Sequence, residues 1–307
     1  MENSYKYTVA GHTFRIILPD GFTDGKYLEQ YSSFASDAAD PLFTLRVSLA
    51  DNLREVAGGQ VKDIFNDEPP YFWLFDRTDA REGMYPWFFA FSYHKSRPDC
   101  VLHASEDFTD AVVYVPSAEA CRLVSFALSN AVMLLYTFTT AFHDTLLVHA
   151  SLISYKGGGY MFLGRSGTGK STHARLWLEN ITGSELLNDD NPVIRVVDGE
   201  VFVYGSPWSG KTPCYKNEYV PLRAVVRLSQ APFNRIAAQS PLHAYASLMP
   251  SCSCMRWDPA STEALHKTVE KVVMSVRGWH LECLPDADAA RTSCAACVPV
   301  ENDSSAL

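Results

Sequence analysis

The strongest constraint on the fold lies in residues 164–171, whose sequence Gly-Arg-Ser-Gly-Thr-Gly-Lys-Ser fits the pattern G-x-x-x-x-G-K-[ST]. An apolar run, residues 160–163, precedes this segment, and a helical pattern follows it. Glycines let the backbone curl so that successive N–H groups point at one anion, and the start of the helix adds about half a positive charge. The segment therefore predicts a phosphate-binding loop between a strand and a helix; a chance match is the alternative.

Such a loop predicts a nucleoside triphosphate as ligand, and we expect ATP with Mg2+. Lys170 would reach the β- and γ-phosphates, while the hydroxyl of Ser171 would coordinate Mg2+. The residues expected to contact the nucleotide are Gly164, Arg165, Ser166, Gly167, Thr168, Gly169, Lys170, Ser171 and Thr172.

A pair of acids, Asp189 and Asp190, follows an apolar segment downstream of the loop. We expect this segment to be a parallel strand that returns beside the loop strand and brings its carboxyl end to the phosphates. One carboxylate would then hold Mg2+, directly or through water, and the other would accept the proton of an attacking hydroxyl. The alternative is a surface turn, because Asn-Asp-Asp-Asn-Pro consists of turn-forming residues.

The loop and the acid pair together resemble the nucleotide site shared by HPr kinase/phosphorylase and phosphoenolpyruvate carboxykinase. That superfamily pairs a Gly-x-Ser-Gly-x-Gly-Lys-[Ser/Thr] loop with an Asp-Asp element, and Val-His-Ala at residues 148–150 is similar to the Val-His-Gly of the HPr kinase branch. The likeness covers residues 146–298. It implies that Asp189 is the general base, that Asp190 is a magnesium ligand and that His149 lies beside them.

The resemblance also implies a fold and a function. The implied fold is an α/β C-terminal domain of the P-loop type found in HPr kinase and phosphoenolpyruvate carboxykinase. The implied function is that of an ATP-dependent phosphotransferase, which transfers the γ-phosphate to a hydroxyl, serine included, of a protein, a peptide or a small molecule. Reverse transfer stays open. The alternative is a nucleotide-binding regulatory or assembly protein without kinase activity.

Two basic residues are candidates for neutralising the transferred phosphate. Lys211 lies in residues 204–213, a loop rich in turn-forming residues that also carries Trp208 and occupies the region where HPr kinases place their own signature. An exposed loop lysine is the alternative. Arg256 offers a planar guanidinium that suits phosphate oxygens, although an ion pair with Asp258 is the favoured interpretation.

The cysteines and the N-terminus indicate the compartment. Residues 1–17 lack the basic-then-apolar layout of a secretion signal, so we expect a cytoplasmic protein whose eight cysteines stay reduced. Close pairs at residues 252 and 254 and at residues 294 and 297 raise the alternative of a four-thiolate zinc site. We favour core packing, because the first pair has the wrong spacing and the second lies in an alanine-rich helical pattern.

The length of the chain favours two domains. Residues 1–116 predict a mainly-β domain, residues 117–143 a helix that connects the halves, and residues 144–307 the P-loop kinase-like domain. Part of the helical segment, residues 123–142, is uncharged and long enough to span a bilayer, but its Ser, Asn and Thr side chains favour a buried helix. The strands predicted in the first domain are residues 13–18, 43–49, 87–93, 101–104 and 111–115. Those predicted in the second domain are residues 146–155, 159–163, 186–197, 201–204 and 224–228.

The balance of charge limits the class of partner. The net charge of −9 comes from 35 acidic and 26 basic side chains, and the basic ones form no run, which argues against a nucleic-acid partner. An acidic protein still binds a nucleotide, because a few N–H groups and one lysine act locally. We expect neither a nucleic acid nor a membrane as partner, whereas a homo-oligomer stays open.

Overall fold

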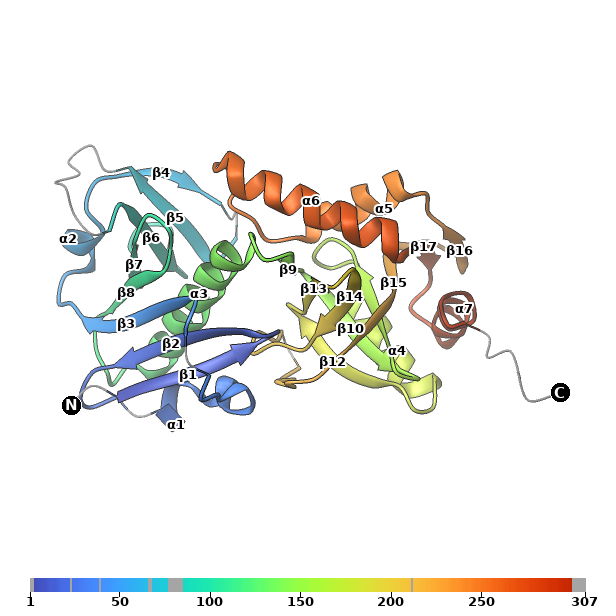
Figure 1. Ribbon diagram of the computed structural model, residues 1–307, viewed down its shortest axis with the longest axis horizontal. Coiled ribbons are helices and arrows are strands. Elements are labelled where there is room, and N and C mark those ends of the chain that lie inside the picture. The colour runs from blue at the N-terminus through green and yellow to red at the C-terminus, as the bar shows by residue number, and fades with distance from the viewer. Residues whose placement is uncertain are drawn as a thin grey trace. The chain divides into compact units, whose positions relative to one another are not determined.

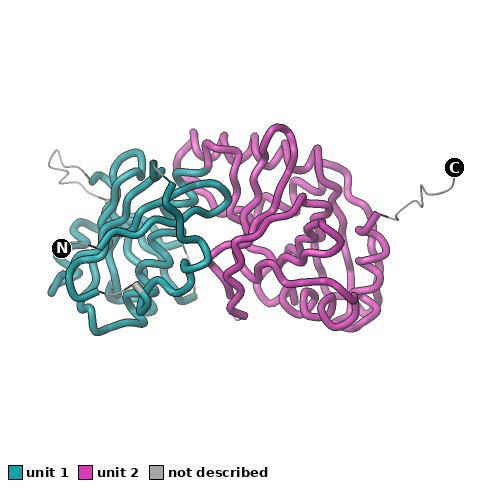
Figure 2. Tube along the Cα trace, turned by 60° about the horizontal axis from the view of Figure 1, so that its bottom comes forward, with its two compact units in different colours: residues 1–140 teal, residues 141–307 magenta. Residues whose placement is uncertain are grey.

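The computed structural model describes residues 3–22, 24–38, 40–65, 68–76, 85–210 and 212–299. The chain divides into two compact units, unit 1 (residues 1–140) and unit 2 (residues 141–307), which Figure 2 shows in different colours. Each unit contains one sheet with helices, so this is a mixed α/β protein with two sheets. Lys211, a candidate site residue, lies outside the described residues.

The sheet of unit 1 is mixed, with the strand order β1-β2-β3-β8-β7-β6-β5-β4. The pairs β2–β3 and β3–β8 are parallel and the others antiparallel. Along β2, Phe14, Ile16 and Leu18 are fully buried, as expected for a strand with one face on a core. The strands are β1 (Asn3–Val9), β2 (His12–Leu18), β3 (Phe43–Leu49), β4 (Gln60–Ile64), β5 (Tyr71–Asp76), β6 (Trp87–Ser92), β7 (Cys100–Ala104) and β8 (Asp110–Val115).

The long helix α3 (Cys121–Thr140) packs on β3, β7 and β8 within unit 1. It is long and apolar enough to cross a membrane, a test that the core helix of a soluble protein also passes. Its packing on the sheet favours the core-helix interpretation, and the hydroxyls of Thr137 and Thr140 donate to carbonyls one turn earlier. The segment expected to connect the halves thus contains a helix that belongs to unit 1. The shorter helices of unit 1 are α1 (Asp24–Tyr27), η1 (Glu29–Phe34) and α2 (Leu53–Ala57).

Unit 2 is built on a second mixed sheet (Figure 1). Its main path is β12-β10-β11-β15-β14-β13-β9, and β17 pairs with β15 and with β16. The strands are β9 (Thr145–Leu147), β10 (Ala150–Tyr155), β11 (Gly158–Leu163), β12 (Glu185–Asp190), β13 (Val193–Val197), β14 (Glu200–Tyr204), β15 (Tyr219–Gln230), β16 (Arg235–Ala238) and β17 (Arg277–Cys283). The strands β16 and β17 were not predicted from the sequence.

The order of β10, β11 and β12 corrects one expectation from the sequence. We expected the acid-bearing strand β12 directly beside the loop strand β11, but β10 lies between them and runs antiparallel to both. The reason is the tight turn at Lys156 and Gly157, whose φ angles of 47° and 69° suit a two-residue hairpin that pairs β10 with β11. Because β11 and β12 still run in the same direction, their carboxyl ends reach the same edge of the sheet.

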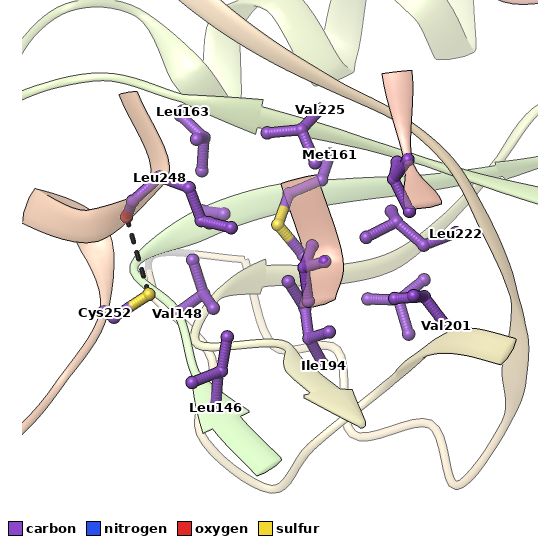
Figure 3. Close-up of a cluster of buried hydrophobic side chains, with 14 of the residues drawn as sticks. Leu146, Val148, Met161, Leu163, Ile194, Val201, Leu222, Val225, Leu248 and Cys252 are labelled. Carbon is purple, nitrogen blue, oxygen red and sulfur yellow. Dashed lines mark hydrogen bonds between the residues drawn. The ribbon is translucent and has the colours of Figure 1, made fainter. Parts of the chain in front are cut away.

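Helices cover both faces of the sheet in unit 2 (Figure 1). Tyr160 and Phe162 of β11 belong to the core under α4 and α7, whereas Met161 and Leu163 belong to the core under α5 and α6, part of which Figure 3 shows. This alternation explains the continuous apolar run before the loop, because a strand buried on both faces needs apolar residues at every position. The helices are α4 (Lys170–Asn180), α5 (Pro241–Leu248), η2 (Met249–Ser251), α6 (Pro259–Ser275) and α7 (Ala287–Cys297).

Two segments that the sequence predicted as single strands are divided in the structure. Residues 146–155 form β9 and β10 with His149 near the break, and residues 186–197 form β12 and β13 with a break at Pro192. Proline has no N–H, so a ladder cannot continue through it; its carbonyl accepts from Val148 N at 3.1 Å. The two breaks place the segment around His149 and the acid pair at one edge of the sheet.

The cysteines are all free thiols. Cys252 is buried in the core drawn in Figure 3, where its Sγ donates to Leu248 O at 3.5 Å. Burial also raises the pKa of the Cys297 thiol to about 12. In the part of the chain that the structure describes, no group of three or more His, Cys, Asp or Glu side chains could hold a metal ion. The four-thiolate alternative therefore gains no support from the fold.

Candidate functional site

The loop between β11 and α4 has a backbone that can hold an anion. Gly167 and Gly169 have φ angles of 77° and 106°, in a region that a side chain disfavours, and Thr168 N donates to Arg165 O at 3.1 Å to close a turn. Gly169 is the N-cap of α4 and has no side chain to accept a hydrogen bond from the helix. The first N–H groups of α4 are therefore left to a ligand or to water.

Lys170 is the first residue of α4, and its side chain turns back across the loop. Its Nζ donates to Gly164 O at 3.0 Å and lies 2.9 Å from His149 Nε2. The residue is only 8% exposed; burial lowers the pKa of Lys170, an effect that Asp190 and Asp189 oppose. A buried ammonium of this kind gains stability from an anion that arrives beside it.

The two acids at the end of β12 have different surroundings. Asp189 is 4% exposed; its Oδ1 accepts from Ser151 Oγ at 2.6 Å. The Asp190 side chain is 36% exposed, and its Oδ2 accepts from Asn191 Nδ2 at 2.8 Å. The φ angle of Asp190 is 145°, which a residue with a side chain rarely adopts, and such strain concentrates at functional sites. Asp190 is therefore the carboxylate of the pair that solvent reaches.

His149 connects the loop to the acid pair. Its Nε2 lies 2.9 Å from Lys170 Nζ, and its Nδ1 lies 3.0 Å from Asp190 Oδ1. A charged Lys170 only donates hydrogen bonds, so in that state Nε2 accepts from Lys170 and Nδ1 donates to Asp190. The three side chains therefore form one hydrogen-bonded chain.

A buried turn holds the acid pair in place. Asn188 is fully buried; its Nδ2 donates to Ser206 Oγ at 3.1 Å and its Oδ1 accepts from Asn191 N at 2.9 Å. Ser206 Oγ in turn donates to Asn191 O at 2.6 Å. On the other side, Gly210 N donates to Asp189 O at 2.6 Å. These bonds fix the strained backbone at Asp190 from two directions.

An Asn188→Ala variant is expected to lower the free energy of unfolding of unit 2 by about 1–3 kcal/mol, because it removes the buried amide that accepts from Asn191 N and donates to Ser206 Oγ. Urea unfolding followed by hydrogen exchange on peptides from residues 141–307 measures the change. Asn180→Ala is the matched control, since its amide donates to Leu176 O at a half-buried position where water can replace it. Equal losses in the two variants would contradict this account of the turn.

The structure brings four of the predicted site residues together: His149, Lys170, Asp189 and Asp190. On the loop, Arg165, Ser166 and Ser171 are exposed, whereas Thr172 is half-buried.

Two other residues considered from the sequence, Trp208 and Arg256, are not part of this group. Trp208 is 3% exposed, so it belongs to the buried turn and offers no binding surface. Arg256 is exposed, and the Asp258 carboxylate accepts from Ser261 N at 2.7 Å, where it caps α6. Three supporting residues were missed by the sequence: Ser151, Asn188 and Ser206. Only Asn188 had a local signal, since it stands directly before the acid pair.

Comparison with known proteins gave three results. A search of curated proteins found no match. The structure of the Hpr(Ser) kinase/phosphatase from Coxiella burnetii is 9% identical and has a TM-score of 0.28, over 47% of this chain and 89% of that chain. The model of the family described as SynChlorMet cassette protein ScmC matches residues 116–275, just over half of the chain. The chain belongs to the SynChlorMet cassette protein ScmC family.

Proposed function

We propose that this protein is an ATP-dependent phosphotransferase that transfers the γ-phosphate of ATP to a hydroxyl group. The observation that carries the proposal is the chain of contacts from Lys170 through His149 to Asp190, which joins the loop to an accessible carboxylate. A site that only bound phosphate would need the loop and the lysine. A carboxylate that contacts His149 adds a group that can accept a proton.

The loop and Lys170 form the binding part of the proposed site. The N–H groups at the start of α4 would face the phosphate oxygens, and Lys170 would exchange its contact with Gly164 O for the β- and γ-phosphates. Burial lowers the pKa of Lys170, and a polyphosphate beside it would favour the charged form of this side chain.

The oxygen donors around the loop fit a magnesium ion. Mg2+ in nucleotide sites is held by one or two carboxylates together with phosphates and water, so it needs no cage made of protein alone. Ser171 offers an exposed hydroxyl on α4, and Asp189 offers a carboxylate at the end of β12. When bound, Mg2+ would neutralise charge on the β- and γ-phosphates.

The surroundings of the two acids suggest the opposite roles to those expected from the sequence. Asp190 is accessible and is oriented by His149, which suits the base that removes a proton from an acceptor hydroxyl. Asp189 is buried beside Ser151, which suits a group that faces the metal and its water. As Asp190 takes the proton, the acceptor oxygen would form a bond to the γ-phosphorus, and the bond to the β-phosphate oxygen would break to release ADP.

The test is incubation of the protein with γ-labelled ATP, Mg2+ and a cell extract separated into protein and metabolite fractions. We expect label in one fraction, which identifies the acceptor as a macromolecule or a small molecule. The same incubation with α-labelled ATP is the control, because transfer of the γ-phosphate leaves no α-label on the acceptor. Binding of ATP without label in either fraction would favour the second candidate, a nucleotide-binding regulatory or assembly protein.

A further inference from the structure

A cavity of about 580 Å3 lies beside the loop in unit 2. Gly167 and Gly169 form one side of it, and Thr172 continues that side along α4. The wall formed by the sheet contains Leu228 of β15 and Cys283 of β17. The volume falls within the range of roughly 300–1,000 Å3 that is usual for small-molecule sites.

The position of the cavity in the sheet points to a ligand. The strands β11, β15 and β17 are neighbours and run parallel, so their carboxyl ends lie at one edge of the sheet (Figure 1). Open α/β sheets bind ligands outside the carboxyl ends of such strands. The loop follows the end of β11, and the cavity lies at the ends of β15 and β17.

The residues that line the cavity indicate how a bound nucleotide would be oriented. Of the described residues, the lining includes loop and α4 residues but not His149, Lys170, Asp189 or Asp190. A triphosphate with its γ-phosphate at Lys170 would therefore extend its other end past Thr172 into the cavity. We propose that the cavity binds the nucleoside part of the nucleotide, an inference that rests on the proposed function.

The apolar side chains and the hydrogen-bond donors of the wall determine how the base of a nucleotide would be bound. Its apolar part includes Leu228 and Leu284. Two main-chain donors of the wall are already engaged: Ala231 N donates to Cys283 O at 3.1 Å, and Leu284 N donates to Asn234 Oδ1 at 2.9 Å. The base would thus be held mainly by apolar contact and not by main-chain hydrogen bonds from these two residues.

Because the wall is largely apolar, we expect the site to distinguish only weakly between adenine and guanine nucleotides. The Gln230 amide lines the cavity and donates to Gly167 O at 3.4 Å, at an exposed position where water competes. Sites that hydrogen-bond a ligand group reject analogues strongly, whereas apolar sites discriminate weakly. We therefore expect the dissociation constants of MgATP and MgGTP to agree within roughly tenfold.

The experiment compares MgATP, MgGTP and magnesium tripolyphosphate by calorimetry on the full chain. For the unmodified protein we expect MgATP to bind roughly tenfold to a hundredfold more tightly than tripolyphosphate, which is the gain from burying one ring system. Ala231→Trp fills the cavity from a half-buried position; it should remove this advantage and leave tripolyphosphate binding unchanged. Ala231→Ser is the matched control and should behave as the unmodified protein does.

Each outcome decides between the two proposals. Equal affinities for MgATP and tripolyphosphate in the unmodified protein would overturn the cavity proposal and leave the phosphate loop intact. Failure of all three ligands to bind would overturn the proposed function and the cavity proposal together. If Ala231→Trp does not fold, Leu284→Ala serves instead, because this side chain is 38% exposed and its truncation only removes apolar contact. An unchanged MgATP affinity in Leu284→Ala would then reject the proposal.

Discussion

An Asp190→Asn variant is expected to lose phosphoryl transfer by roughly 10²–10⁴-fold, the usual contribution of a general base. The amide keeps the size of the side chain and can still accept from His149 Nδ1, but it cannot take a proton. Affinity for MgATP should stay within about threefold, because the phosphates are held by the loop and Lys170. Initial rates with γ-labelled ATP and calorimetric affinities measure the two effects separately.

Asp189→Asn is the matched control for the assignment of roles. If Asp189 faces the metal, this variant should need more Mg2+ for half-maximal activity, and added Mg2+ should restore part of the rate. Added Mg2+ should not rescue Asp190→Asn. The reverse pattern, with rescue at Asp190 and none at Asp189, would return the two acids to the roles expected from the sequence.

A Lys170→Met variant is expected to weaken MgATP binding by roughly 30-fold to several thousand-fold. The estimate corresponds to about 2–5 kcal/mol for removing one partner of a buried, hydrogen-bonded charge pair. The methionine side chain is close to lysine in length and suits the buried position, where Lys170 is 8% exposed, so the fold should be retained. Calorimetric titration with MgATP measures the loss.

Exposed loop residues provide the comparison for Lys170→Met. Arg165→Met removes a positive charge from the same loop at an exposed position, where solvent screens it. Its affinity for MgATP should fall much less than that of Lys170→Met. Equal losses would mean that general attraction to a basic loop, and not the buried ammonium, determines the affinity.

Individual strands and helices could be predicted from the sequence, because the patterns that indicate them depend on neighbouring residues. The apolar run of residues 160–163 predicted β11, and the glycine-rich loop predicted the start of α4 at Lys170. Pairing between distant strands was harder to infer. The amino-acid sequence of β12 does not indicate that β10 lies between β12 and β11. This order depends on the hairpin at Lys156 and Gly157, which lies outside β12.

The residues that the structure brings together could be named from the sequence, but the contacts between them could not. The loop pattern and the acid pair made Lys170, Asp189 and Asp190 candidates, and the family resemblance added His149. The division of the acids into a buried and an accessible one depends on the broken strands around Pro192 and on the turn fixed by Asn188. A one-residue difference in register decides which acid meets His149, and such differences are not visible in composition or spacing.

Binding of a nucleoside triphosphate by the loop and Lys170 can be measured by equilibrium dialysis of the full chain against labelled ATP with Mg2+. We expect saturation at one ATP per chain with a dissociation constant of about 1 μM to 1 mM, the range common for enzyme substrates. A folded protein that retains no more ATP than its Lys170→Met variant at every concentration would contradict this expectation.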